Sequence, residues 1–224
     1  MIYITGDTHI PIDITKLNNK NFLEQEYLTK DDYILILGDF GGVFSGSNEE
    51  MYWRNWLHER NFTTLFIDGN HESFALLNKF PIKKWNGGKV HFINDSIIHL
   101  MRGQIFTIDN LKFFTMGGAT SIDKHHRIEG KSWWPEEMPN NKEFNEGMKN
   151  LDKHNWEVDY VLTHATPQPI FDVLNCYRIN DPLCGYFDML EEKLTFKEWF
   201  CGHMHKDVDV DKYTLLYNRV IKLI

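Results

Sequence analysis

The sequence is poor in cysteine and has no long apolar run. Its three cysteines, Cys176, Cys184 and Cys201, form no C-x-x-C pair, which excludes both a disulfide framework and a thiolate zinc site. We therefore expect a reducing, cytoplasmic compartment. No apolar stretch approaches the roughly 18 residues of a membrane span, and the first residues lack the basic and apolar regions of a signal peptide. Accordingly, no membrane partner is expected.

Basic side chains are also in short supply. The chain has 24 Lys and Arg against 32 Asp and Glu, a net charge of -8. This balance argues against a protein that binds nucleic acid by neutralising phosphates alone. No linker, low-complexity stretch or internal repeat divides the sequence, so we expect one domain over residues 1–224. Hydrophobic residues make up 42% of the chain, enough for a core that needs no structural metal.

The sequence contains five copies of one pattern, an apolar run followed by a potential metal ligand. A short aliphatic or β-branched run ends in a small or polar residue, and a potential metal ligand follows; the runs lie at 2–5, 33–37, 65–67, 160–163 and 199–201. The residues that follow them are Asp7, His9, Asp39, Asn70, His71, His164, His203 and His205. Such runs suit strands buried on both faces. If the strands share a sheet, the groups at their carboxyl ends converge on one crevice.

Helical and hairpin patterns separate these runs. Ser47 and Glu50 have the spacing of a capping box at the start of a helix. Further helices are predicted at 73–79 and around 144–151. The turns at 109–110 and 211–212 lie between short alternating runs, as in β-hairpins. These elements predict an α/β fold in which two sheets form a β-sandwich flanked by helices.

The potential ligands are spaced so that they can bind two ions. In extended backbone, residues i and i+2 point the same way, so the pairs at 7–9 and 203–205 can each aim two side chains at one point. Together with Asp39, Asn70 and His164 they make seven ligands. If one carboxylate is shared, each of two divalent cations receives four. Imidazole, carboxylate and amide ligands without thiolate favour Mn²⁺, Fe or Zn²⁺ over Mg²⁺ or Ca²⁺.

The order of the motifs resembles that of the calcineurin-like metallophosphoesterases, and the stretch 117–135 resembles one in small microbial and phage members. The matching motifs are Gly-Asp-x-His at 6–9, Gly-Asp at 38–39, Gly-Asn-His-Glu at 69–72, a lone His at 164 and Gly-His-x-His at 202–205. The resemblance implies a two-sheet sandwich with helices on both sides. It also implies a first metal held by Asp7, His9, Asp39 and His205, and a second held by Asp39, Asn70, His164 and His203, with Asp39 bridging.

The same resemblance implies a dinuclear, metal-dependent phosphoesterase. It would hydrolyse a phosphomonoester or phosphodiester by attack of a metal-bridging hydroxide, with Mn²⁺ the expected ion and Fe or Zn²⁺ as alternatives. His71 would be the catalytic residue, stabilising phosphoryl oxygens or protonating the leaving oxygen. The substrate would be a small phosphoester or a phosphoprotein.

One departure from the family pattern bears on substrate binding. Protein Ser/Thr phosphatases of this type carry Asp-Arg-Gly at the second motif, whereas this chain has Asp39-Phe40-Gly41, so that phosphate-clamping arginine is missing. His126 and Arg127 are candidates to supply the cationic contact. The alternative is that this polar run is simply a solvated loop face.

Two other functions stay open. A binding scaffold that keeps the fold but has lost turnover typically lacks the histidine after Asn, and here His71 is present. A nuclease needs a groove for the strand, and the sequence offers no basic stripe outside 79–89. The sequence does not predict the oligomeric state.

Overall fold

Two β-sheets pack face to face in the computed structural model, which describes residues 1–224. The first sheet contains β1 (Ile2–Thr5), β2 (Tyr33–Leu37), β3 (Thr63–Ile67), β4 (Ile82–Trp85), β5 (Gly88–Asn94), β6 (Ile97–Leu100) and β13 (Val220–Lys222). The second contains β7 (Gln104–Ile108), β8 (Leu111–Met116), β9 (Tyr160–Thr163), β10 (Glu198–Cys201), β11 (Val208–Val210) and β12 (Tyr213–Leu215). Their orders are β13-β1-β2-β3-β6-β5-β4 and β11-β12-β10-β9-β8-β7.

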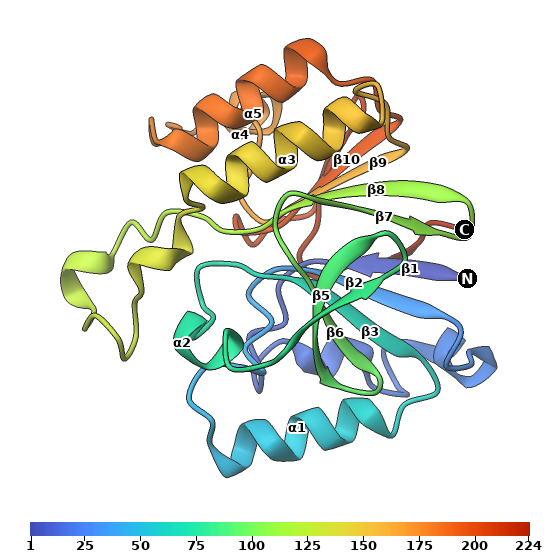
Figure 1. Cartoon of the computed structure of the whole chain (residues 1–224). Coiled ribbons are helices and arrows are strands. Elements are labelled where there is room, and N and C mark those ends of the chain that lie inside the picture. Colours follow the sequence, from blue (N-terminus) through green and yellow to red (C-terminus); the bar gives the residue numbers. More distant parts are fainter.

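Helices cover the outer face of each sheet, which confirms the expected α/β sandwich (Figure 1). The helices beside the first sheet are α1 (Asn48–His58) and α2 (Phe74–Leu77), and those beside the second are α3 (Asn141–Lys153), α4 (Gln168–Leu174) and α5 (Pro182–Lys193). None has the length and apolar character needed to cross a bilayer. The segment between β8 and α3, with short 3₁₀ turns at Lys124–His126 and Pro135–Glu137, projects away from the sandwich (Figure 1).

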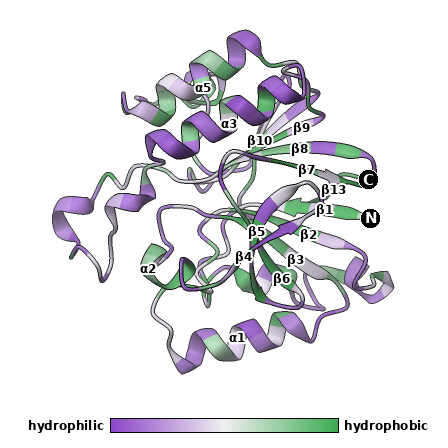
Figure 2. Ribbon diagram, in the orientation of Figure 1, coloured by the Kyte–Doolittle hydropathy of each residue, from purple (hydrophilic) through white to green (hydrophobic).

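The central strands are apolar along their whole length because both of their faces are buried. In β1, Ile2 and Ile4 face the core between the two sheets, whereas Tyr3 faces the core under the helices. The inter-sheet core takes residues from both sheets, such as Leu35 of β2 and Phe200 of β10. Figure 2 shows this distribution, with apolar strands inside and mostly hydrophilic helices outside. Continuous apolar runs are what a doubly covered strand requires.

The five ligand-bearing strands do not share one sheet. β1, β2 and β3 are parallel neighbours in the first sheet, and β9 and β10 are parallel neighbours in the second. Their carboxyl ends nevertheless meet at one edge of the sandwich, because the two sheets stack with these strands pointing the same way (Figure 1). The crevice is thus built between sheets rather than within one.

The capping box predicted at α1 forms only by half. The Ser47 side chain accepts the Glu50 amide at 3.2 Å, but the Glu50 carboxylate turns back to accept the Phe44 and Gly46 amides. Glu50 is buried, and the Ser47 amide donates instead to the Ser45 hydroxyl at 3.2 Å, so the helix start does not need the Glu50 carboxylate as an acceptor. A complete capping box occurs instead at α3, between Asn140 and Glu143.

Candidate functional site

The seven expected ligands come together where β1, β2, β3, β9 and β10 end. Two overlapping sets of donor atoms each lie within 4.8 Å of one another: Asp7, His9, Asp39 and His205 in one, and Asp39, His164 and His203 in the other. Asn70 joins the second set through Oδ1, which lies 3.1 Å from His164 Nε2. Asp39 is the member that both sets share. This grouping has the composition of two candidate metal sites.

The Asp39 carboxylate faces both sets at once. Its Oδ2 lies 3.3 Å from His9 Nε2, and its Oδ1 lies 3.4 Å from His164 Nε2. Oδ1 also accepts the backbone N–H of His71 at 2.8 Å. Burial alone would raise the pKa of Asp39, but the His164 and His9 imidazoles hold that pKa well below its usual range. The carboxylate is therefore charged and directed to two neighbours.

The backbone at the cluster adopts conformations that ordinary residues avoid. Four expected ligands have positive φ: His9 at 31°, Asp39 at 44°, His203 at 73° and His205 at 48°. Such residues each cost on the order of 1–3 kcal/mol and gather at functional sites, where the surrounding structure enforces them. Four such residues in one cluster indicate that the surrounding structure holds these side chains in position at the expense of favourable backbone conformations.

Two glycines let the loops approach one another closely enough. A Cβ on Gly69 would collide with the Asp39 carboxylate. Gly38 has φ 91°, and a Cβ there would collide with the His164 ring. Glycine is required at both places because any side chain would fill the space that the ligands occupy.

Two of the imidazoles are oriented by acceptors behind them. His164 Nδ1 lies 2.8 Å from the Leu37 carbonyl oxygen, and His9 Nδ1 lies 2.8 Å from Asp13 Oδ2. With Nδ1 used as the donor, Nε2 is the ring atom that faces the carboxylates in each case. Burial lowers the pKa of both rings, but the carboxylates overcome it, Asp39 chief among them, and raise the pKa to about 9 for His9 and about 10 for His164. The negative field of the carboxylates, which favours a proton on these rings, also favours a metal cation at the same place.

Asn70 is also held in one orientation. Its Nδ2 donates to Ser121 Oγ at 3.1 Å, and Ser121 Oγ donates to Glu137 Oε2 at 2.6 Å. This relay fixes which end of the amide is the oxygen, so that Oδ1 faces His164. Ser121 and Glu137 lie in the projecting segment, which therefore contributes to the site.

Glu72 joins two of the ligand loops from beneath. One carboxylate oxygen accepts the Phe40 amide and the other accepts the Gly69 amide, both at 2.6 Å. The side chain is fully buried. Burial, together with the Asp39 and Asp68 carboxylates, raises the pKa of Glu72 to about 8. The sequence motif includes this residue, but its bridging position appears only in three dimensions.

The donor set fits a pair of divalent cations. Asp7 Oδ2 is buried and receives no hydrogen bond, although His205 Nε2 lies 3.2 Å from it. A buried acceptor without a donor is costly, and a cation between these two atoms would satisfy both. All the side chains in the cluster offer nitrogen or oxygen and none offers sulfur, which matches the ligand preference of Mn²⁺, Fe and Zn²⁺.

His71 lies beside the cluster, with its ring centroid 5.7 Å from that of His9. The Arg127 guanidinium nitrogens lie 3.1 and 3.2 Å from the two ring nitrogens of His71. Arg127 is paired with Asp123 at 2.7 and 2.9 Å. Burial lowers the pKa of His71, and the Arg127 charge lowers it further against the pull of Asp39. The structure thus brings Arg127 to the site through His71.

His126 is not part of this arrangement. It is exposed on the projecting segment, and its ring packs on His125 with centroids 4.0 Å apart. Its expected contact with substrate stays a prediction. Sequence reasoning also missed Asp13, Ser121 and Glu137, whose roles depend on contacts between loops and have no motif to mark them.

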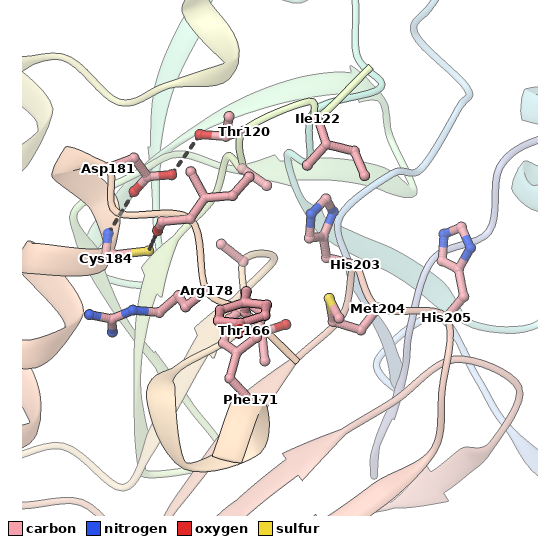
Figure 3. Close-up of a pocket in the computed structure, with 14 residues that line it drawn as sticks. Thr120, Ile122, Thr166, Phe171, Arg178, Asp181, Cys184, His203, Met204 and His205 are labelled. Atoms are coloured by element: carbon pink, nitrogen blue, oxygen red, sulfur yellow. Dashed lines mark hydrogen bonds between the residues drawn. The ribbon is translucent and has the colours of Figure 1, made fainter. Parts of the chain in front are cut away.

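Two cavities flank the cluster. One of about 320 Å³ adjoins His203 and His205, and the other, of about 480 Å³, adjoins His9 and His71. The first is drawn in Figure 3. A substrate bound at the cluster therefore has room on two sides.

Comparison with known proteins gives a family and a fold. The family model for calcineurin-like phosphoesterases matches residues 1–207, whereas no curated protein matches the chain. One similar solved structure is a Staphylococcus aureus protein assigned provisionally as a 5′-nucleotidase, in complex with α-ketoglutarate. It is 14% identical with a TM-score of 0.51, and the match covers 96% of this chain and 48% of that one. The chain thus spans about half the length of that structure, and so low an identity shows the fold alone.

Proposed function

The chain belongs to the calcineurin-like phosphoesterase family; from that premise we propose that it is a metal-dependent hydrolase that cleaves a phosphomonoester or phosphodiester at a dinuclear centre. The observation that carries the proposal is the Asp39 carboxylate, whose two oxygens face different imidazoles. A site for one ion needs only one of those sets. The second set has no role in a mononuclear enzyme.

The proposed ligands divide as the two donor sets do. Asp7, His9, Asp39 and His205 hold one ion, and Asp39, Asn70, His164 and His203 hold the other. Mn²⁺ is the proposed metal, with Fe and Zn²⁺ as the alternatives, because neutral imidazole and carboxylate suit all three. Bound there, the two ions would supply Lewis acidity that lowers the pKa of water and neutralises charge on phosphoryl oxygens.

The protein's own residues position the substrate and supply a proton. His71 borders the 480 Å³ cavity next to the cluster, where its ring can stabilise a phosphoryl oxygen or protonate the leaving oxygen. Arg127 keeps that ring in place and adds positive charge on the same side of the cluster. The Asp123 carboxylate pairs with the Arg127 guanidinium and offsets its charge, so the main effect of Arg127 is orientation of His71.

The proposal is tested by counting metal and measuring hydrolysis. Protein loaded with Mn²⁺ should contain two ions per chain by elemental analysis and should hydrolyse p-nitrophenyl phosphate, bis(p-nitrophenyl) phosphate or both. Chelation should abolish turnover, and Mn²⁺ should restore it. Asp39→Asn should reduce binding of both ions together, because it weakens the shared ligand. Full activity with a single bound ion would contradict the dinuclear centre.

We also infer the setting of the enzyme. A single domain over residues 1–224 is supported by the core that both sheets share. A cytoplasmic location is supported by three cysteines that form no disulfide. The substrate is proposed to be a small phosphoester or a phosphoprotein, and the acidic balance gives no support to nucleic acid as a partner.

A further inference from the structure

We propose that the cavity beside His203 and His205 binds the organic group esterified to the phosphate, and that this group is an uncharged aromatic ring system. The inference rests on the proposed function, because it names the substrate class of the same site. We call this space the His203 cavity. It is the space of about 320 Å³ shown in Figure 3.

The position of the His203 cavity is the first argument. His203 and His205 belong to different donor sets, so the space that they border opens at the boundary between the two proposed ions. A phosphate bound by both ions would lie at the mouth of the cavity. In Figure 3 the cavity extends from these histidines toward Phe171 and Ile122. A group attached to the phosphate through oxygen can therefore enter it directly.

The lining of the His203 cavity is rich in apolar side chains that are exposed to water, which is unfavourable for them. Ile122, Phe171, Tyr177, Ile179 and Met204 line it. The exposed fractions of Ile122 and Ile179 are 74% and 40%, and the Tyr177 ring is fully exposed. Covering such surface is favourable by roughly 25 cal/mol for each Å². A flat ring can contact aliphatic, thioether and aromatic neighbours together.

The charged residues of the His203 cavity are already paired within the protein. Both terminal nitrogens of Arg178 donate to Asp188, at 2.5 and 2.7 Å. Asp181 accepts from the Thr120 hydroxyl at 2.6 Å and from the Cys184 amide at 2.8 Å. In Figure 3 the Arg178 guanidinium points away from His203. Arg178 is neutralised by Asp188, and both Asp181 oxygens already accept hydrogen bonds. Neither side chain is left to bind a charged substituent, so the occupant is uncharged.

Size narrows the occupant further. At about 320 Å³, the His203 cavity is at the lower end of the roughly 300–1,000 Å³ typical of ligand sites. That volume suits one ring system and is too small for the flanking residues of a phosphopeptide. The cavity therefore favours a small aromatic phosphoester over a phosphoprotein.

The experiment compares an aromatic and an aliphatic substrate in matched variants. Ile122→Ser should lower kcat/KM for 1-naphthyl phosphate by about fivefold or more and leave that for glycerol 2-phosphate within twofold. Ile128→Ser is the control, because Ile128 is 61% exposed on the same segment but does not line the cavity. Each variant is compared with the parent on the same substrate, so the different reactivities of naphthol and glycerol esters cancel.

A second pair of variants guards against misfolding in the projecting segment. Phe171→Ala should give the same selective loss, and Val173→Ala, on the same helix but outside the cavity, should not. Equal losses on both substrates, or no loss, would overturn the cavity assignment and leave the phosphoesterase standing.

If the parent hydrolyses neither ester, the nitrophenyl esters alone decide the proposed function, and binding decides the cavity. Titration of Mn²⁺-loaded protein with 1-naphthylmethylphosphonate, followed by naphthalene fluorescence, should show Kd raised about fivefold in Phe171→Ala. An unchanged Kd would overturn the assignment.

Discussion

His71 lies against the cluster without belonging to either donor set, so replacing it can separate an effect on catalysis from an effect on metal binding. We predict that His71→Ala keeps two ions per chain and lowers kcat by about 10²–10⁴, the range for a positioned acid. Elemental analysis and steady-state kinetics measure the two effects. As a control, replacing the exposed His125 with Ala should change neither the metal content nor kcat. Turnover equal to the parent at full metal content would remove His71 from the mechanism.

Glu72 is a positioning residue, since its two oxygens hold the Phe40 and Gly69 amides on neighbouring loops. Glu72→Ala leaves two buried donors unpaired, at a cost of about 1–3 kcal/mol each. Glu72→Gln keeps one acceptor and should lose about half as much. Urea unfolding gives the stabilities, and Mn²⁺ titration should show weaker binding in the same order. A glutamine variant as damaged as the alanine variant would contradict this division.

At this scale the sequence predicts the residues that carry motifs and misses those that support them. Every expected ligand lies at the end of an apolar run, so strand ends alone place it near the cluster. Asp13 and Ser121 act through contacts across loops, and the Leu37 carbonyl is a backbone atom that any residue would supply. No spacing in the sequence marks such partners, because the fold creates them.

The best-formed helix start in the structure is that of α3, where Asn140 and Glu143 make reciprocal hydrogen bonds. Asn140→Ala removes the N-cap and should lower the free energy of unfolding by about 1 kcal/mol. Thermal unfolding measures the loss. Because α3 packs on the outer face of the second sheet, kcat and metal content should not change. Lost activity would show that this helix is coupled to the site.

Strands and tight turns were predictable at the element scale, and their assignment to sheets was not. Asp109 and Asn110 both have positive φ, as the hairpin pattern requires. An apolar run fixes burial on two faces, but nothing in it says which sheet it joins, so the division of the five strands came only from the structure. Helix α5 was overlooked although Asp181 and Pro182 mark its start.

At the scale of the whole molecule, one buried polar network ties the two halves together beneath the site. Asp68, at the end of β3, pairs with Arg102, which also reaches Glu143 on α3 beside the other sheet. Asp68 Oδ1 lies 3.1 Å from His99 Nε2, and His99 Nδ1 lies 3.1 Å from His91 Nδ1. Burial opposes the charge on Asp68, but Arg102 and His99 hold its pKa far below the usual range. The stability of the fold therefore depends on the protonation of these buried groups and should be sensitive to acid.

His91 should make the fold lose stability in mild acid. Burial and the neighbouring His99 lower its pKa to about 4, against about 6.5 in an unfolded chain. Between those values the unfolded state takes up a proton that the folded state refuses, so stability falls as pH drops from 6.5 to 4. The loss reaches roughly 3 kcal/mol at most.

The measurement is the free energy of unfolding in urea at several pH values, in chelator, for the parent and for His91→Gln. The variant cannot take up that proton, so its curve should be flatter between pH 6.5 and 4.5 whatever its stability at pH 7. Asp68 and the histidines at the metal cluster also titrate, but they are common to both proteins and cancel in the difference to the extent that they are independent of His91. Parallel curves would mean that the acid sensitivity comes from other groups.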